Sequence, residues 1–581
     1  MVGVPAVVIA APASGSGKTT VATGLIGALR RVGHRVAPFK VGPDYIDPGY
    51  HGLAAGRPGR NLDPVLVGAE RVVPLYQHGA RGCDLAVVEG VMGLFDGRID
   101  ENHAGPVAEG STAQVASLLG APVVLVVDAR GHSQSLAALL HGFATFDSGI
   151  RLGGVILNRV GSERHDQVLR TACDRVGLPV LGSLPRMAEL EVPSRHLGLI
   201  PAVEHGTAAT AAVAAMTDLV AAHVDLHAIA ALARSAVTGP AWDPVTEVRA
   251  AGVLGMRTVV TGEAGAVVPE RTTAMGSAGL VPEGPAAMGS AGVVVPEGTA
   301  AMGGVDAAVP EPVGATATGE VPGQSAETGG AAAAIPGRVA AARGAGTVVP
   351  ERNSSQLGGD AVGARGMSQQ PDAGPVIAMA GGAAFTFGYA EHRELLVAAG
   401  ARVVVFDPLR DELPSGVAGL VLPGGFPEEH AAELAANVGL LRAVAEQARQ
   451  GLPVHAECAG LLYLTRSLDG HPMAGVVDAD AEFGPRLTLG YRDAVALADS
   501  ALWRAGERVR GHEFHRTRLV STAADAPAWG WHGSDGARVK EGALVHRVHA
   551  SYLHTHPAGN PEATGRFVTA AADYASTRAI G

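Results

Sequence analysis

Short apolar runs alternate with longer mixed stretches through the first 245 residues. Four of these runs predict buried strands: Val4–Ala11, Leu85–Glu89, Pro122–Asp128 and Gly154–Asn158. The stretches between them are long enough for the crossover helices that parallel strands require. Because strands buried on both faces are continuously apolar, the pattern predicts a parallel α/β sheet over 1–245.

The same pattern returns near residue 375. Apolar runs that predict strands occupy Val376–Ala380, Arg402–Phe406, Gly419–Leu422 and Pro453–Ala456. Helical stretches at Glu391–Ala399 and Glu429–Gln450 separate some of these runs. We therefore expect a second α/β domain over 375–581.

Between these halves the composition changes. Residues 243–384 contain no aromatic residue and no cysteine, and a Pro-Glu pair recurs at 269, 282, 296 and 310, a spacing of 13 to 14 residues. Such repeats can form a solenoid when each unit has an apolar face to stack on the next, but large apolar side chains are scarce here. A disordered linker over 246–374 is the favoured interpretation.

Bulk properties exclude several classes of protein. The 581 residues exceed what one core supports, which agrees with more than one domain. A net charge of −12 disfavours an electrostatic nucleic-acid binder. The three cysteines form no CxxC pair, so neither a disulfide framework nor a zinc site is indicated, and a reduced, cytoplasmic setting is expected. No apolar run reaches the roughly 18 residues of a membrane span, and the first run lacks the basic start of a signal peptide.

A glycine-rich segment, APASGSGKTT at 11–20, follows the first predicted strand and precedes a helical pattern. This order of strand, loop and helix is the context of a phosphate-binding loop. Gly15 and Gly17 let backbone N–H groups approach phosphate oxygens, and the helix N-terminus favours an anion. Lys18 can reach the β- and γ-phosphates, and the Thr19 hydroxyl can bind Mg²⁺. Pro12 stands where the strict pattern has glycine, so the loop is a variant one.

Polar residues follow other predicted strands. Glu89 ends the apolar run at 85–89 and would lie beside the loop, at the edge of the sheet where ligands bind in such folds. It is a candidate Mg²⁺ ligand, or else an ordinary surface glutamate. Asp44 and Asp47 could bind Mg²⁺ or help activate an acceptor, although aspartate is also common in turns. Asn158 could read a nucleobase edge or cap its own loop.

Cys458 lies between a predicted strand and an Ala/Gly-rich helix start. This is the form of a nucleophile elbow, and a helix N-terminus lowers the pKa of a thiol. The alternative is a small buried core residue. Gly424 and Gly425 end another predicted strand, and their N–H groups could form an oxyanion hole.

Two histidines near the C-terminus, His554 and His556, could supply a base for the thiol. A strand through this segment would place both on one face, and His554 is the preferred base. A metal site at the pair has no third ligand at a fitting spacing.

Together these segments resemble the cobyrinic acid a,c-diamide synthase family, which includes the hydrogenobyrinic acid a,c-diamide synthases of cobalamin synthesis. The variant phosphate loop is of the kind found in dethiobiotin synthetase-like ATPases. The resemblance covers 1–245 and 375–581. Its motifs are APASGSGKTT (11–20), KVGPDYIDP (40–48), VVEGVMGLFDG (87–97), LPGGFPE (422–428), HAECAGLLYL (455–464), GHEFHRT (511–517) and SYLHTH (551–556).

The resemblance implies two coupled activities. The N-terminal half would use ATP and Mg²⁺ to convert a side-chain carboxylate of hydrogenobyrinate or cobyrinate into an acyl phosphate. The C-terminal half would be a class I glutamine amidotransferase with a flavodoxin-like fold, in which Cys458 attacks L-glutamine and His554 raises its nucleophilicity. Ammonia would then displace phosphate on the a and c acetate groups in turn. A homodimer is left open, and neither a nucleic-acid nor a membrane partner is expected.

The residues assigned to these centres fall into four groups. They are, for catalysis, Cys458, His554, Asp44, Asp47 and Glu89; for the nucleotide, Gly15, Gly17, Lys18, Thr19, Thr20 and Asn158; for the oxyanion hole, Gly424 and Gly425; and for the metal, Thr19, Asp47 and Glu89. No third glutaminase partner is identified. Two positions after the catalytic histidine, where many class I amidotransferases have glutamate, the chain has His556.

Two other functions are weighed. A cobyric acid synthase would amidate other corrinoid side chains, but the Asp44–Asp47 loop and the GHEFH segment disfavour it. A regulatory P-loop ATPase with an inert glutaminase-like domain is disfavoured by the variant loop and by the Cys458 and His554 pair. The alanine- and glycine-rich composition is typical of high-GC genomes. Many organisms with such genomes make cobalamin by the route that inserts cobalt late, so the composition favours hydrogenobyrinate over cobyrinate.

Overall fold

The computed structural model describes residues 3–99, 105–186, 194–195, 198–199, 202–252, 374–522, 526–533 and 535–580. Residues 1–258 and 365–581 belong to one compact unit. Most of the expected linker, 253–373, lies outside the described residues. Helix α11 (Pro244–Ala250) runs across the boundary expected at residue 245, and its Val248 is fully buried. Among the described helices, none combines the length and apolar character needed to cross a bilayer.

The parallel sheet predicted for the N-terminal half is confirmed. Its seven strands lie in the order β3-β2-β4-β1-β5-β6-β7, and all neighbours are parallel. The strands are β1 (Ala6–Ala10), β2 (Val36–Val41), β3 (Arg60–Leu62), β4 (Leu85–Glu89), β5 (Val123–Asp128), β6 (Leu152–Val160) and β7 (Val180–Pro185). The central position of β1 brings the phosphate loop to the middle of the carboxyl edge, where such sheets bind ligands.

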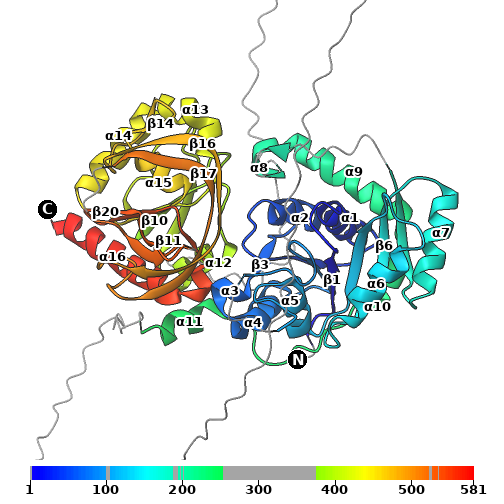
Figure 1. The fold of residues 1–581 in the computed structure, drawn as a ribbon. Coiled ribbons are helices and arrows are strands. Elements are labelled where there is room, and N and C mark those ends of the chain that lie inside the picture. Colours follow the sequence, from blue (N-terminus) through cyan, green and yellow to red (C-terminus); the bar gives the residue numbers. More distant parts are fainter. Residues whose placement is uncertain are drawn as a thin grey trace, which may run out of the picture. The chain divides into compact units, whose positions relative to one another are not determined.

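Helices cover both faces of this sheet. On one face lie α1 (Lys18–Arg31), α2 (Asp47–Ala55) and α9 (Thr207–His223), and on the other α4 (Ala69–Gly79), α5 (Thr112–Leu119), α6 (Leu136–Thr145) and α7 (Glu163–Asp174), as Figure 1 shows for several of them. Along β1, Val7 and Ile9 pack into the first layer, and Val8 packs into the second. Alternation of this kind explains why the predicted strands read as unbroken apolar runs. The shorter elements are α3 (Pro64–Val67), α8 (Ala202–His205), α10 (Leu226–Leu232), β8 (Ser194–Arg195) and β9 (Gly198–Leu199).

The C-terminal half contains a second largely parallel sheet in the order β11-β10-β12-β13-β21-β20. Counted along the chain with the antiparallel edge strand β20 left out, the five parallel strands follow the order 2-1-3-4-5, which is the flavodoxin-like order, so the predicted fold class is confirmed. The strands are β10 (Val376–Ala380), β11 (Arg402–Phe406), β12 (Val417–Leu422), β13 (Val454–Glu457), β20 (Ala543–Val545) and β21 (Val548–Ser551). The helices are α12 (Ala390–Ala398), α13 (Ala431–Ala436), α14 (Val438–Arg449), α15 (Ala459–Leu464) and α16 (Pro561–Ile580), with η1 (Pro427–His430) and η2 (Pro557–Gly559).

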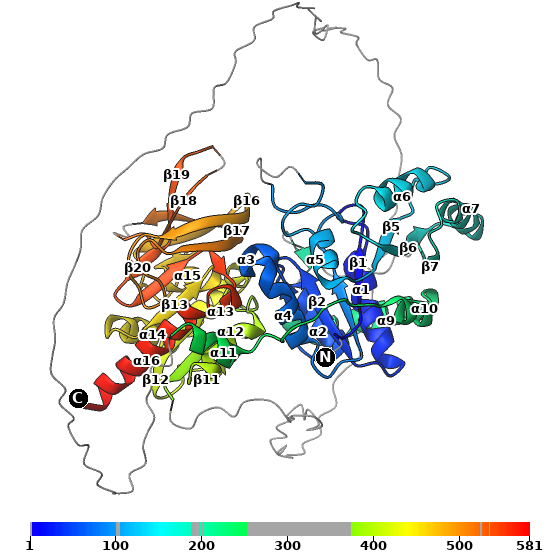
Figure 2. The same cartoon turned by 90° about the horizontal axis from the view of Figure 1, so that it is seen from below.

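A third sheet was not predicted. It is mainly antiparallel and is built on two long paired strands, β16 (Ala479–Ala496) and β17 (Arg508–Thr522). In Figure 2 the strands β16 to β19 gather apart from helices α14 and α16. The other strands are β14 (Ser467–Leu468), β15 (His471–Pro472), β18 (Trp529–His532), β19 (Arg538–Glu541) and β22 (His554–Thr555). Pairing of His512 with His554 joins β17 to β22 and so connects this sheet to the predicted histidine segment.

The single helix expected over 429–450 is divided. It begins as η1 and α13, and a new helix, α14, starts after Asn437. The Asn437 side chain accepts a hydrogen bond from Leu440 N at 3.4 Å, so it caps the new helix.

Ion pairs and hydrogen bonds join the two halves within the compact unit. The Arg60 guanidinium contacts Glu391, with Nη1 2.5 Å from Oε1, and also Glu394. The Tyr491 hydroxyl donates to Asp63 Oδ2 at 3.1 Å. Arg60 is largely buried, so its charge depends on these two partners for compensation.

Candidate functional site

The phosphate loop runs from β1 to α1. Gly15 and Gly17 have φ angles of 78° and 93°, in the left-handed region that glycine adopts with little strain. A Cβ at Gly17 would overlap the side-chain amide of Asn158, whose Nδ2 donates to the Ser16 carbonyl at 2.9 Å. Asn158 therefore braces the loop from β6. Contact of Asn158 with a nucleobase stays a prediction.

Lys18 is the first residue of α1, and the first turn of that helix carries no acidic side chain. Its ammonium donates to the Met92 carbonyl at 2.5 Å. Burial, together with the nearby charge of Lys40, lowers the pKa of Lys18. Free N–H groups and a buried cation thus meet at one helix end, which suits a phosphate. Thr20 follows in the same turn and is half-buried.

Three oxygen-bearing side chains converge beside the loop. The Thr19 hydroxyl lies 2.7 Å from Glu89 Oε1 and 3.2 Å from Asp47 Oδ2. They come from the starts of α1 and α2 and from the end of β4. One hydroxyl and two carboxylates beside a phosphate site are the donor set with which Mg²⁺ is usually held, the remaining positions going to phosphate and water. The structure therefore brings together the three residues predicted to hold the metal.

The sequence did not identify Lys40 and His51 as members of this cluster. Lys40 Nζ donates to Asp47 Oδ2 at 2.6 Å and to Glu89 Oε1 at 2.9 Å. Nε2 of His51 lies 2.7 Å from the other oxygen of Glu89. The one indication in the sequence was Lys40 itself, which stands within the buried strand β2. A buried charge needs an oppositely charged partner.

Charge compensation sets the protonation of this cluster. Burial, with Asp44 next in importance, raises the pKa of Asp47 to about 6, although Lys40 opposes the shift. Burial also acts on Glu89, but Lys40 and His51 outweigh it and hold the pKa of Glu89 well below its usual range. The same carboxylates outweigh the burial of Lys40 and raise its pKa. At neutral pH the Asp47 and Glu89 carboxylates and the Lys40 ammonium are therefore charged.

Asp44 has a structural contact of its own. Its Oδ1 accepts hydrogen bonds from Ile46 N at 2.8 Å and Asp47 N at 3.0 Å. This is the turn geometry that the sequence left open as an alternative. It orients the start of α2 and so the carboxylate of Asp47.

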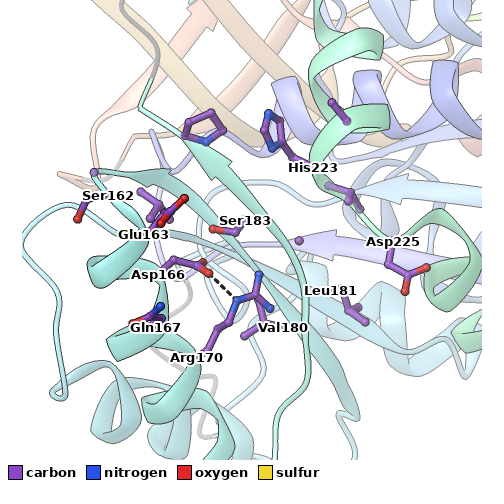
Figure 3. A pocket seen from close by; sticks show the side chains of 16 residues that line it. Ser162, Glu163, Asp166, Gln167, Arg170, Val180, Leu181, Ser183, His223 and Asp225 are labelled. Atoms are coloured by element: carbon purple, nitrogen blue, oxygen red, sulfur yellow. Dashed lines mark hydrogen bonds and ion pairs between the residues drawn. The ribbon is translucent and has the colours of Figure 1, made fainter.

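An open pocket of about 800 Å³ lies along the edge strand β7, between α7 and the segment after α9 (Figure 3). The ion pair between Arg170 and Asp166, 2.6 Å from Nε to Oδ2, forms part of its wall. None of the residues predicted from the sequence lines it. The predicted chemistry is located elsewhere, at the carboxyl ends of the strands.

Cys458 occupies a sharp turn between β13 and α15, with φ 48° and ψ −98°. This backbone conformation is uncommon for a residue with a side chain, and it recurs where a nucleophile is held at a strand-to-helix turn. Cys458 N donates to the Ser551 carbonyl at 2.7 Å, which ties the turn to β21. A Cβ at Gly460 would overlap the Leu422 carbonyl, so α15 needs glycine there to approach β12.

The two predicted oxyanion glycines take different positions. Burial raises the pKa of the Cys458 thiol, and Glu428 adds to that effect, while hydrogen bonds from the N–H groups of Ala459 and Gly425 oppose it. The Gly425 N–H therefore lies next to the Cys458 sulfur, close to where the carbonyl oxygen of a substrate attacked by this thiol would develop its charge. Gly424 instead faces His554, and a Cβ on it would overlap Cε1 of the ring.

His554 and His556 are both fully buried, but the strand expected to run through both of them does not extend to His556. Strand β22 ends at Thr555, and His556 caps η2, where its Nδ1 accepts from Ala558 N at 3.2 Å. The His556 ring packs on Tyr389, with 4.1 Å between centroids. Burial lowers the pKa of each histidine to about 4, so both are neutral at pH 7. Of the two, His554 is the one whose ring lies against the glycine pair.

Tyr45 lies between the two centres. Its ring stacks on Phe387 at 5.0 Å and packs against His554 at 5.1 Å, measured between centroids. Along the chain it stands between Asp44 and Asp47 of the metal-side loop. The loop that carries Asp44 and Asp47 thus contacts the predicted base of the thiol directly.

Two protein-family models match the chain. A CobQ/CobB/MinD/ParA nucleotide binding domain matches residues 7–200, and a CobB/CobQ-like glutamine amidotransferase domain matches residues 376–561. The first match contains the phosphate loop and the Thr19, Asp47 and Glu89 cluster. The second contains Cys458 and His554.

Curated relatives match along nearly the whole chain. Hydrogenobyrinate a,c-diamide synthase from Mycobacterium tuberculosis is 51% identical over 569 residues, covering 98% of each chain. The protein of that name from Streptomyces coelicolor is 51% identical over 573 residues, covering 97% of each. Cobyrinate a,c-diamide synthase from a Synechococcus strain is 32% identical over 575 residues, covering 97% of this chain and 98% of its own.

Proposed function

Because the chain belongs to the family of hydrogenobyrinate and cobyrinate a,c-diamide synthases, we propose that it amidates the a and c acetate groups of a corrinoid. The reaction uses ATP and glutamine, and the enzyme is a glutamine-dependent amidating ligase. The relatives at 51% identity carry the hydrogenobyrinate name, whereas the cobyrinate relative is at 32%. This difference supports hydrogenobyrinate as the substrate. A homodimer and a cytoplasmic location stay predictions.

The N-terminal centre activates the carboxylate. A carboxylate resists attack by ammonia, so its oxygen first takes the γ-phosphoryl group of ATP and ADP leaves. Lys18 and the N–H groups of the loop bind the phosphates, and Lys40 holds Asp47 and Glu89 in place. Thr19, Asp47 and Glu89 would hold Mg²⁺, which when bound neutralises phosphate charge and orients the nucleotide.

The C-terminal centre supplies ammonia. The Cys458 sulfur attacks the side-chain amide carbon of glutamine, and the thiol proton passes to His554 and then to the departing nitrogen. The Gly425 N–H stabilises the oxyanion. Water then hydrolyses the thioester to glutamate. Ammonia attacks the acyl phosphate, phosphate leaves and the amide remains.

One observation carries the proposal. A hydroxyl shared by two carboxylates at a phosphate loop, and a cysteine in a strained elbow next to a glycine pair that also packs on a buried neutral histidine, occur in one compact unit. Each alone serves many reactions. The pair supports phosphoryl activation combined with glutamine-derived ammonia, since free ammonia is largely protonated in water and is best generated near its acceptor.

Mass spectrometry of the products tests this proposal. Hydrogenobyrinate and cobyrinate are supplied separately with ATP, Mg²⁺ and glutamine. Two successive conversions of carboxylate to amide are expected, faster with hydrogenobyrinate. No amide from either corrinoid would reject the proposed function, and equal rates would reject the preference.

A further inference from the structure

The imidazole of His554, the proposed base of the glutaminase centre, has no hydrogen-bond partner within its own segment among the described residues. Both ring nitrogens of His554 are buried, and among the described residues neither has a hydrogen-bond partner. An imidazole that takes a thiol proton at Nε2 needs its other proton held at Nδ1, which in comparable centres is the task of a carboxylate. His556, at the position where many class I amidotransferases have glutamate, caps η2 and packs on Tyr389 instead.

A carboxylate faces His554 from a different strand. Glu457 is the last residue of β13 and directly precedes Cys458. Its Oε2 lies 3.9 Å from Nδ1 of His554. This distance is long for a hydrogen bond, but catalytic contacts often shorten only when substrate binds. Because Cys458 is its chain neighbour, Glu457 lies within the elbow itself.

The other oxygen of Glu457 is held in place. Oε1 accepts hydrogen bonds from Thr555 N at 3.0 Å and from the Thr555 hydroxyl at 2.9 Å. Nε2 of His455, two residues earlier on the same strand, lies 3.3 Å from the same oxygen. Three contacts thus fix one oxygen and direct the second at His554.

Charge agrees with this geometry. Burial opposes ionisation of Glu457, but His455 and His554, with the N–H of Thr555, hold its pKa at about 2. The Glu457 carboxylate is therefore negatively charged at neutral pH. The negative charge of Glu457 raises the pKa of His554, although burial lowers that pKa by more.

We propose that Glu457 is the positioning residue of the glutaminase centre, which holds the Nδ1 proton of His554 and stabilises the imidazolium formed when Cys458 loses its proton. The third member of the centre thus precedes the nucleophile along the chain instead of following the base. With Nδ1–H directed at Glu457, the lone pair of Nε2 is free for the thiol. This inference rests on the proposed function.

Glu457→Gln tests the role, because the amide keeps the size of the side chain and an acceptor for Thr555 but removes the charge. We expect kcat for glutamine hydrolysis to fall about a hundredfold or more, with KM for glutamine nearly unchanged. Ammonia-driven amidation should match the wild type. Because the lost charge no longer raises the pKa of His554, the acid limb of residual hydrolysis should move to lower pH.

Glu541→Gln is the matched control. Glu541 is another glutamate of this half with two fixed contacts, its Oε2 accepting from the Ser551 hydroxyl at 2.6 Å and its Oε1 from Tyr552 N at 2.7 Å. Neither of these two contacts involves His554. The Glu541→Gln variant should therefore hydrolyse glutamine within about threefold of the wild type. Glu457→Asp keeps the charge and should recover part of the activity lost in Glu457→Gln.

Several outcomes overturn the proposal. They are a kcat for Glu457→Gln within about threefold of the wild type, an equal loss in Glu541→Gln, an unmoved acid limb, or a loss of ammonia-driven amidation alongside hydrolysis. If Glu457→Gln does not fold, Glu457→Asp decides, since no recovery of kcat in a folded protein rejects a role for the charge. A wild-type protein without glutaminase activity would instead reject the proposed function itself.

Discussion

Gly424 lies against the imidazole of His554 so closely that no side chain fits between them. Hydrogen bonding of Phe387 N to the Gly424 carbonyl, at 3.0 Å, fixes the backbone on that side. The neighbouring Gly425 directs its N–H at Cys458. Consecutive glycines therefore contact the proposed base, His554, and the proposed nucleophile, Cys458.

Replacing Gly424 by alanine should displace His554 and lower glutamine hydrolysis by about a hundredfold or more, because a base moved by an ångström no longer meets the thiol. Ammonia-driven amidation should persist. Gly439→Ala in α14 is the matched control, since a Cβ there meets nothing within 4 Å, and it should leave both activities intact. Unchanged hydrolysis in Gly424→Ala would contradict the assigned position of the base.

The pH dependence of hydrolysis should reflect the buried histidine. Only neutral His554 can accept the thiol proton, and burial lowers its pKa to about 4. The kcat/KM for glutamine should therefore stay level from pH 7 to about 5 and decline as the pH approaches 4, with folding checked by circular dichroism at each pH. A half-maximal loss near 6.5, the ordinary value for histidine, would show that His554 is not buried as described or is not the base.

Lys40 should matter for stability as well as for catalysis. Its ammonium is nearly inaccessible to solvent and bridges Asp47 and Glu89. Lys40→Met would leave two buried carboxylates without their main counter-charge, so the free energy of unfolding should fall by about 3–5 kcal/mol in urea titrations. Lys540→Met, at an exposed position of β19, should change it by less than about 0.5 kcal/mol. A Lys40→Met protein as stable as the wild type would show that Lys40 is not the main group that compensates the charges of Asp47 and Glu89.

The strands that could be predicted from the sequence are those that contain a continuous run of apolar residues. The bounds of β4, β10 and β11 were predicted without error because each contains at least four successive apolar residues. Strand β2 was not predicted, since Pro38 and Lys40 interrupt its pattern although both are buried. The partners that neutralise Lys40 come from α2 and β4, so only the fold makes a buried lysine acceptable there. The long strands β16 and β17 carry many exposed polar residues and give no apolar run.

The candidate site was predictable where a local pattern carries it. The phosphate loop and the elbow at Cys458 are continuous segments, and the structure forms both turns as expected. The carboxylate that faces His554 was not predictable, because the pattern of class I amidotransferases points to the position of His556, whereas Glu457 ends the strand before Cys458. His51 was missed for the same reason, since its contact with Glu89 joins a helix to a distant strand.

The most direct test of the account compares glutamine with ammonia as the nitrogen source for a Cys458→Ala variant. Amide formation on hydrogenobyrinate is followed with ATP and Mg²⁺ present, and the wild type should use either source. The variant should form no amide from glutamine and should match the wild type with ammonia, because the activating centre at Thr19, Asp47 and Glu89 remains intact. A variant that still uses glutamine, or a folded variant that fails with ammonia, would contradict the division of labour between the two centres.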